Sequence, residues 1–268
     1  MICDVEPPGV TVDHLKHFPK IIAHRGFCAQ HIENTIPALK AAVSAKADMI
    51  EIDVHETRDG NFIVYHDNSL NHDTPSWGSL TFAQVQNLTD HDDRAPLLSD
   101  CLKAIGSTPV NIEIKSCVNT ISLVRELKSS SPSPGSVISS FDFHLLKRLH
   151  TQGVILPLIL IVAISKQLTW GKNIRNAYLC LAPQLLPKFL DGLSVHYNLA
   201  HKSLIKCLQS KGSTVFVWTV DEFTRMKKFI SLGVDGIITN YPDRLQELKD
   251  RFISSSTLQH FMKIVSES

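Results

Sequence analysis

The chain has 268 residues, of which 43% are apolar and 20% are charged, and its formal net charge is +1. This composition is typical of a globular protein with a large core, and the near-zero charge gives no electrostatic reason to expect a nucleic-acid or membrane-surface binder. The length suits one α/β barrel, so we expect a single domain over residues 1–268.

The two ends of the chain are expected to lie outside the main fold. Residues 1–19 should form an irregular lead-in, because several prolines interrupt any helical or strand period. This segment also lacks the basic and long apolar regions of a secretory signal. Residues 251–268 read as a mixed tail that accommodates one terminal helix.

Two features bear on the cellular setting. The longest apolar run, Val154–Ile164, contains Pro157 and is shorter than the roughly 20 residues that cross a bilayer, so no stable membrane insertion is expected. The six cysteines are scattered without a CxxC pair, which is typical of a reduced, cytoplasmic protein. We therefore expect a cytoplasmic protein with a small-molecule ligand and no nucleic-acid partner. The sequence indicates no particular oligomeric state.

The first predicted strand, Lys20–Ala23, ends at the tripeptide HRG. A helix should follow over Ala38–Lys46, because this stretch is rich in good helix formers. Asn34 and Thr35 lie near its amino end as candidate capping residues, and Pro37 lies in its first turn, where a missing N–H costs little.

The second predicted strand, Met49–His55, alternates apolar and polar residues. Its period of two places Glu51, Asp53 and His55 on one face and aliphatic residues on the other. Charged residues are uncommon inside strands unless they are paired, bind a metal or face a cavity. This face is therefore a candidate site.

The next predicted strand, Phe62–Tyr65, follows after a short turn. The connection is too short for a helical crossover, so the two strands should form an antiparallel hairpin. In such a ladder Asp53 would lie roughly opposite His66, which would place a carboxylate and an imidazole side by side.

A polar insertion is expected over residues 68–95, after the hairpin. Loops of this length in a compact domain are usually functional or disordered. One short helix, Thr81–Leu88, is predicted inside the insertion, and a second helix, Pro96–Ile105, follows it. The next strand, Val110–Lys115, repeats the alternation of the second strand, with the polar residues Asn111, Glu113 and Lys115 on one face.

The rest of the chain alternates between strands and helices. The expected strands are Val137–Phe141, Leu156–Ala163, Gly192–His196, Thr214–Val220 and Asp235–Thr239. The expected helices are Thr120–Lys128, Phe143–Gln152, Thr169–Leu179, Lys202–Ser210, Glu222–Leu232 and one that begins near Pro242. This alternation predicts a parallel sheet covered by helices. We predict a (β/α)8 TIM barrel with a hairpin irregularity after the second strand and a small insertion after His66. The sequence has no GxGxxG, Walker A or GxSxG motif and no internal repeat.

A barrel of this kind has its active site at the carboxyl ends of the strands. His24 and His66 follow strand ends, and Glu51, Asp53 and Glu113 lie on strands beside them. Three carboxylates at one place suit a hard divalent cation, Mg²⁺ or Ca²⁺, better than zinc.

Two positively charged side chains belong to the same candidate site. Arg25 offers a planar fork for phosphate oxygens, and Lys115 offers a second positive charge. Two histidines on opposite sides of a phosphate can act as general base and general acid, in an order that the sequence leaves open. Together these residues predict metal-assisted cleavage of a phosphodiester, by attack of either water or a neighbouring hydroxyl.

A resemblance to a known family supports this interpretation. The motifs HRG, ENT, EIDVHETRDG, VYHD, NIEIK, VWTV and GVDGIITNYPD occur in this order between residues 21 and 247. In these motifs the sequence resembles the glycerophosphodiester phosphodiesterase family. The resemblance implies a TIM barrel that hydrolyses glycerophosphodiesters to sn-glycerol 3-phosphate and an alcohol, with a divalent metal. It implies His24 and His66 as the catalytic pair, and Glu51, Asp53 and Glu113 as the metal ligands.

The same resemblance implies substrate-binding roles for Arg25, Lys115, Glu33 and Trp218. Arg25 and Lys115 match groups that contact phosphate, Glu33 belongs to the ENT element, and Trp218 matches an apolar wall of the pocket. Packing within the barrel is a nearly equal alternative for Trp218. The chain departs from the family pattern at Asn240, where an Asp commonly ends the last strand, and we expect this position to be structural.

Two other functions compete with this interpretation. A lysophospholipase D would use the same site on an acylated glycerol, but it needs an apolar groove, and the polar insertion offers little apolar surface. A binding module would hold a phosphorylated ligand without hydrolysis, and the complete set of carboxylates and histidines argues against it.

Overall fold

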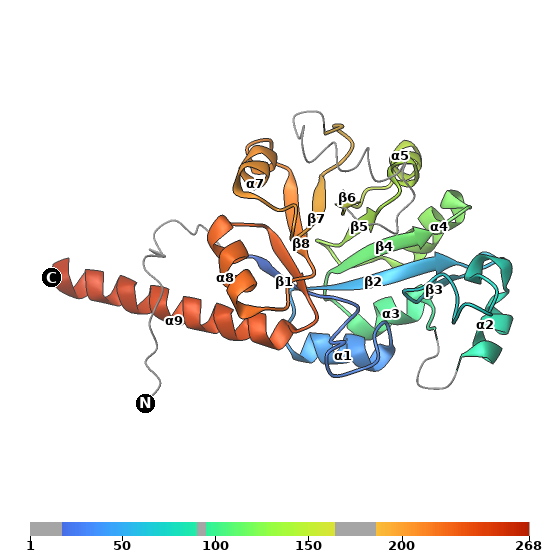
Figure 1. Cartoon of the computed structure of the whole chain (residues 1–268), viewed down its shortest axis with the longest axis horizontal. Coiled ribbons are helices and arrows are strands. Elements are labelled where there is room, and N and C mark those ends of the chain that lie inside the picture. The colour runs from blue at the N-terminus through green and yellow to red at the C-terminus, as the bar shows by residue number, and fades with distance from the viewer. Residues whose placement is uncertain (1–17, 90–94, 164–185, 268) are drawn as a thin grey trace.

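The structure is a computed structural model that describes residues 18–89, 95–163 and 186–267. Its strands are β1 (Lys20–Ala23), β2 (Met49–Glu56), β3 (Phe62–Val64), β4 (Val110–Ser116), β5 (Val137–Ser140), β6 (Leu158–Val162), β7 (Gly192–His196), β8 (Thr214–Trp218) and β9 (Gly236–Thr239). Eight of them run parallel in the order β1-β9-β8-β7-β6-β5-β4-β2, and pairing of β1 with β2 closes the ring (Figure 1). The predicted TIM barrel is therefore confirmed.

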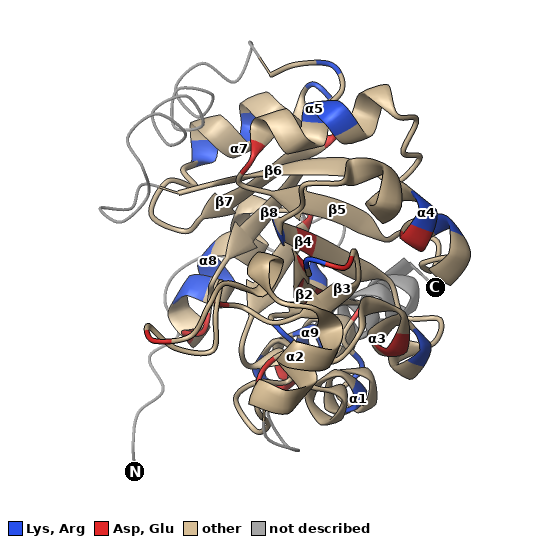
Figure 2. Ribbon diagram, turned by 90° about the vertical axis from the view of Figure 1, so that its right-hand side faces the viewer, with Lys and Arg blue, Asp and Glu red and all other residues tan. Residues whose placement is uncertain are grey.

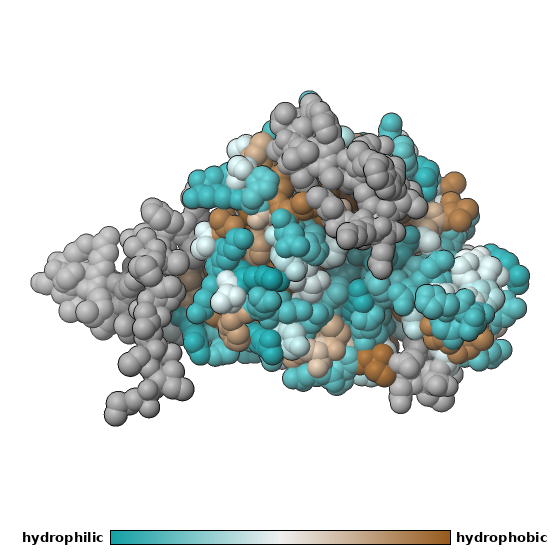
Figure 3. All heavy atoms as spheres, viewed as in Figure 1, coloured by the Kyte–Doolittle hydropathy of each residue, from teal (hydrophilic) through white to brown (hydrophobic). Residues whose placement is uncertain are grey.

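Helices surround this ring. They are α1 (Ile36–Ser44), α2 (Phe82–Leu88), α3 (Leu98–Ile105), α4 (Thr120–Ser130), α5 (Phe143–Thr151), α7 (Lys202–Gln209), α8 (Phe223–Leu232) and α9 (Pro242–Glu267). The Thr35 side chain accepts the Ala38 N–H at the start of α1, as its capping role predicts. Among the described helices, none is both long and apolar enough to cross a membrane. The face shown in Figure 3 is mostly hydrophilic, with small separate hydrophobic areas.

The period of two in the strands separates two apolar layers. Ile50, Ile52 and Val54 of β2 belong to the large core between the strands and the helices. Met49 instead joins residues of β1, β5, β6, β8 and β9 in a smaller apolar cluster. Because these strands come from all around the ring, the cluster fills the barrel interior. The polar face of β2 therefore lies above an apolar floor.

The hairpin of β2 and β3 forms as predicted, but its register differs by one residue from the expected one. Thr57 N–H donates to the Asn61 carbonyl at 2.8 Å, and this turn fixes the ladder. Tyr65 N–H consequently donates to the Asp53 carbonyl at 2.9 Å. Tyr65, rather than His66, lies opposite Asp53, because the turn closes between residues 57 and 61.

The described part of the insertion after the hairpin, residues 68–89, is more ordered than its polar composition predicts. Trp77 is fully buried and packs with Ile63, Leu80 and Val85 in a small separate core. Its indole N–H donates to the Asp67 carbonyl at 2.7 Å. The insertion therefore anchors the backbone directly after His66.

Other predicted elements agree with the structure to within one or two residues at their ends. The predicted tail continues the last helix, because α9 runs unbroken from Pro242 to Glu267. The helix expected over Thr169–Leu179 and residues 1–17 of the lead-in lie outside the described residues.

Candidate active site

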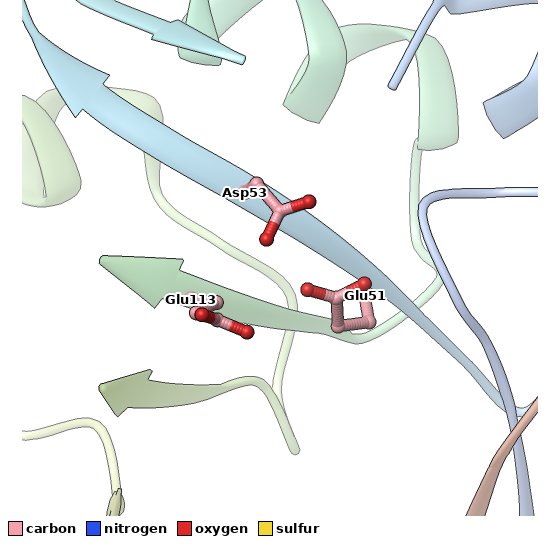
Figure 4. A group of neighbouring side chains, drawn as sticks. All are labelled: Glu51, Asp53 and Glu113. Atoms are coloured by element: carbon pink, nitrogen blue, oxygen red, sulfur yellow. The ribbon is translucent and has the colours of Figure 1, made fainter. Parts of the chain in front are cut away.

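Three carboxylates meet inside the barrel, as the alternation of the strands predicts. Glu51 and Asp53 lie two residues apart on β2, and Asp53 pairs in register with Glu113 on the parallel neighbour β4. Ligand oxygens of the three residues lie within 4.8 Å of one another (Figure 4). Glu51 is 2% exposed and Asp53 is 1% exposed, so water contributes little to their solvation.

Burial and mutual repulsion shape the charge states of this group. Burial, together with the charges of Asp53 and Glu113, raises the pKa of Glu51 well above its usual range. Burial also raises the pKa of Glu113. For Asp53, burial alone would raise the pKa, but the nearby Lys115 and Arg25 outweigh it and lower the pKa to about 2.

The two predicted phosphate-binding cations lie against these carboxylates. Lys115 Nζ is 2.9 Å from Asp53 Oδ1 and 2.5 Å from Glu113 Oε1. Arg25 Nε is 3.1 Å from Asp53 Oδ2. The Arg25 backbone has a left-handed φ of 55°, and its N–H donates to Glu51 Oε2 at 2.9 Å. This sparsely populated conformation aims both the backbone and the side chain of Arg25 at the cluster.

Both predicted catalytic histidines line the same cavity as Glu51 and Glu113. His24 follows β1, and its Nδ1 lies 2.7 Å from Asn240 Oδ1. Burial and the adjacent Arg25 lower the pKa of His24 to about 4. His66 follows β3, and its Nδ1 lies 2.8 Å from an Asp67 carboxylate oxygen. Burial and the Lys115 charge lower the pKa of His66 as well.

The cavity has a volume of about 470 Å³ and two chemically different walls. β2 and β4 supply the charged wall, and Figure 2 shows acidic and basic residues on these strands within the barrel. The opposite wall is largely aromatic and aliphatic. Trp218 lies there, its ring edge-on to Phe141 at 5.8 Å and to His196 at 5.2 Å. Its indole N–H donates to the Ser194 carbonyl, so Trp218 both packs and lines the cavity.

Three polar residues that line this cavity received no site role from the sequence. They are Asn111, which the sequence placed on the polar face of β4, and Ser194 and His196 of β7. Each lies on the inward-facing period of its strand, two residues from another lining residue in β4 or β7. Applying the period of two to every strand would have identified them.

Glu33 lies outside this cavity. Both of its carboxylate oxygens accept hydrogen bonds from Arg25 Nη1, at 2.8 and 2.7 Å. Its side chain is 43% exposed. A substrate contact for Glu33 stays a prediction, and its direct role in the structure is to hold the Arg25 guanidinium.

A larger cavity of about 640 Å³ lies elsewhere on the surface, between α1, α2 and α3. Its lining includes Pro37, Phe82 and Leu97, and contains none of the predicted site residues. The chemistry of the lining, rather than the size of the cavity, therefore identifies the site.

The carboxylate cluster fits the predicted divalent cation. Among the residues that the structure describes, Glu51 Oε1 is buried without a hydrogen-bond partner, which is costly unless a cation or proton satisfies it. The cluster supplies only oxygen donors, and these suit Mg²⁺ or Ca²⁺. Glu51, Asp53 and Glu113 would hold such an ion.

Comparisons with known proteins find one matching family and several similar proteins. The family model described as "Glycerophosphoryl diester phosphodiesterase family" matches residues 24–244. A glycerophosphodiester phosphodiesterase of Caldanaerobacter subterraneus is 29% identical over 85% of this chain and 96% of its own length. The human lysophospholipase D GDPD1 is 27% identical over 87% of each chain.

Solved structures share the fold. A glycerophosphodiester phosphodiesterase from Parabacteroides distasonis aligns with a TM-score of 0.73 and 24% identity, over 90% of this chain and 99% of that one. An Oleispira antarctica phosphodiesterase in complex with the product sn-glycerol-3-phosphate aligns with a TM-score of 0.68 and 22% identity, over 87% of this chain and 97% of that one.

Proposed function

Because this chain belongs to the glycerophosphoryl diester phosphodiesterase family, we propose that it hydrolyses glycerophosphodiesters to sn-glycerol 3-phosphate and an alcohol with one divalent cation. The predicted enzyme class, a phosphodiesterase, agrees with this membership. One observation carries the proposal. A single cavity is lined by His24 and His66 together with two carboxylates and two cations, Glu51, Glu113, Arg25 and Lys115.

The residues of this cavity suit each part of the reaction. Arg25 and Lys115 place positive charge beside the phosphoryl oxygens, where negative charge develops in the transition state. One histidine takes the proton of the attacking oxygen, and the other gives a proton to the departing alkoxide, so a P–O bond forms as another breaks. When bound, a divalent cation supplies Lewis-acid stabilisation of the phosphoryl oxygens.

The test is an assay of glycerophosphocholine cleavage with excess Mg²⁺ or Ca²⁺, and again after chelation. We expect formation of glycerol 3-phosphate with the cation and loss of activity in chelator, restored by adding the cation back. Activity that is indifferent to chelation would contradict the metal requirement. Measurable ligand binding without cleavage at any cation concentration would favour the non-hydrolysing binding module instead.

Lysophospholipase D activity is a second candidate, favoured by the apolar wall of the cavity. Phe141, Ile161, Ala163 and Trp218 line that wall, and some relatives carry the name lysophospholipase D. The polar insertion still favours the water-soluble substrate. The ratio of kcat/KM for glycerophosphocholine to that for lysophosphatidylcholine distinguishes the two, with a ratio above one expected.

A further inference from the structure

One chain of hydrogen bonds behind His24 starts at Asp221 and passes through Asn240. Asp221 Oδ1 accepts from the Asn240 backbone N–H at 2.9 Å and from Thr239 Oγ1 at 3.0 Å. Its second oxygen, Oδ2, accepts from Asn240 Nδ2 at 2.7 Å. Asn240 Oδ1 then faces His24 Nδ1 at 2.7 Å and Cys28 Sγ at 3.0 Å.

The direction of each bond in this chain follows from the chemistry of the groups. An ionised Asp221 carboxylate can only accept, so the amide nitrogen of Asn240 must face it. The amide oxygen of Asn240 must then face His24, and an amide oxygen also only accepts. His24 Nδ1 therefore carries the proton. Cys28 agrees with this orientation, because burial raises the pKa of its thiol to about 12 and leaves it an S–H donor.

We propose that Asp221 and Asn240 are positioning residues that hold His24 as the Nδ1–H tautomer, so that its Nε2 is the general base. With Nδ1 held against Asn240, Nε2 is the ring nitrogen left for a ligand in the cavity that His24 lines. Its lone pair is then free to take the proton of the attacking oxygen. The word "base" rests on the proposed function, whereas the tautomer does not.

The two histidines have different hydrogen-bond partners. His24 faces the amide oxygen of Asn240, which holds the ring proton on Nδ1, while burial and Arg25 keep the ring neutral and Nε2 unprotonated. His66 faces the carboxylate of Asp67 at 2.8 Å, which favours the imidazolium form and so opposes burial and Lys115, which lower the pKa of this ring. Among the charged groups around His24, Arg25 opposes protonation, and Asp53 and Glu33 favour it. With His24 as the base, His66 is the second histidine of the cavity and is left to protonate the leaving alkoxide.

The substitution Asp221→Asn tests the proposal with almost no change in shape. The Oδ1 atom of the new amide still accepts from Thr239 and from the residue 240 N–H, but its NH₂ group now faces the NH₂ group of Asn240. Asn240 should flip, donate to His24 Nδ1 and move the ring proton to Nε2. We expect kcat to fall about 100-fold with little change in KM, because a base acts only in the transition state.

The double exchange Asp221→Asn with Asn240→Asp restores every bond in the chain. The new amide at 221 donates to the new carboxylate at 240, and that carboxylate still accepts from His24 and Cys28. We expect kcat to recover to within about threefold at the optimum of the double variant. The acid limb of its pH profile should move upward by about one to three pH units, because His24 now faces a charge.

Two measurements on the full chain keep the outcomes separate. ¹⁵N NMR of histidine-labelled protein, with His24 assigned by its loss in His24→Gln, reports the tautomer without any substrate. Asp191→Asn is the matched control, since Asp191 accepts the Leu158 N–H at the opposite end of the barrel. Melting curves check that each variant folds.

An Nδ1–H signal in the native chain, lost in Asp221→Asn and regained in the double exchange, supports the proposal. An Nε2–H signal in the native chain overturns it, as does an Asp221→Asn variant with native tautomer and kcat. A folded double variant that stays inactive overturns it too. An Nδ1–H signal in a chain that cleaves no glycerophosphodiester overturns the proposed function and leaves the positioning network standing.

Discussion

Replacing Glu51 by Gln should stabilise the cation-free protein, although it removes a buried charged group of the site. The ligand oxygens lie within 4.8 Å of one another, and two unit charges at that limit repel each other by about 3 kcal/mol at an effective dielectric constant of about 20. Attraction to Arg25 and Lys115 offsets part of this repulsion. Gln keeps an oxygen for the Arg25 N–H, and its new NH₂ group faces the other two carboxylates. We expect the free energy of unfolding in chelator to rise by about 1–2 kcal/mol.

The same substitution should remove the stabilisation that a divalent cation confers. A cation at 100 times its dissociation constant raises the free energy of unfolding by about 2.7 kcal/mol. Urea unfolding of the native chain and of Glu51→Gln, each in chelator and in Mg²⁺ or Ca²⁺, measures both effects. Glu56→Gln is the control on the same strand. Glu56 accepts two backbone N–H groups at the start of α4, so this variant should lose about 0.5–1 kcal/mol and keep the full cation effect.

Two results would refute this reasoning. A Glu51→Gln protein that is less stable than the native chain in chelator would show that repulsion is not the dominant force on Glu51. An equal cation-induced stabilisation in both proteins would show that Glu51 does not hold the cation.

Further predictions concern the histidines and the apolar wall. His24→Ala and His66→Ala should each lower kcat by about 10²–10⁴-fold. The control His72→Ala, at an exposed residue of the insertion, should keep native kcat. Losses below tenfold in both His24→Ala and His66→Ala would remove these two histidines from acid–base catalysis. Burial lowers the pKa of His55 to about 4, so its contribution to stability is complete above pH 6.5 and is lost as the pH falls toward 4. His55→Gln removes the titrating imidazole and serves as the reference. Between pH 7 and pH 4 the free energy of unfolding of the native chain should fall by up to about 3 kcal/mol more than that of His55→Gln. Parallel curves of unfolding free energy against pH would contradict this. Trp218→Ala should raise KM for lysophosphatidylcholine more than for glycerophosphocholine, and equal effects would show that the acyl chain does not use this wall.

The period of two made much of the charged wall predictable from sequence. It placed Glu51 and Asp53 on one face of β2, and Glu113 on the matching face of β4, and the structure brings these oxygens together. The barrel followed from the alternation of strands and helices. These are local patterns, since each depends on residues within one strand or one helix.

The features that escaped prediction depend on contacts across the chain or on turn geometry. Asn240 was expected to be structural, yet it faces His24 across 216 residues of sequence. Closure of the ring brings β9 beside β1, and no periodicity within either strand encodes which side chains then touch. The hairpin register depended on a turn bond from Thr57 to Asn61. Glu33 was assigned to substrate by motif alone, whereas its position beside Arg25 depends on a loop conformation.

The charge balance of the cavity gives the proposed cation a second role beyond catalysis. At a pH above the raised pKa of Glu51 all three carboxylates are ionised, and Arg25 and Lys115 neutralise two of them and leave about one negative charge, which repels a phosphodiester anion. With a divalent cation bound the balance becomes about one positive charge, which matches a phosphodiester monoanion. The phosphomonoester product carries nearly two negative charges near neutral pH. This is more than the one positive charge of the cavity with its cation can neutralise. Under the proposed function, the same cluster therefore favours substrate entry only when the cation is bound, and it favours product release once the ester bond is broken.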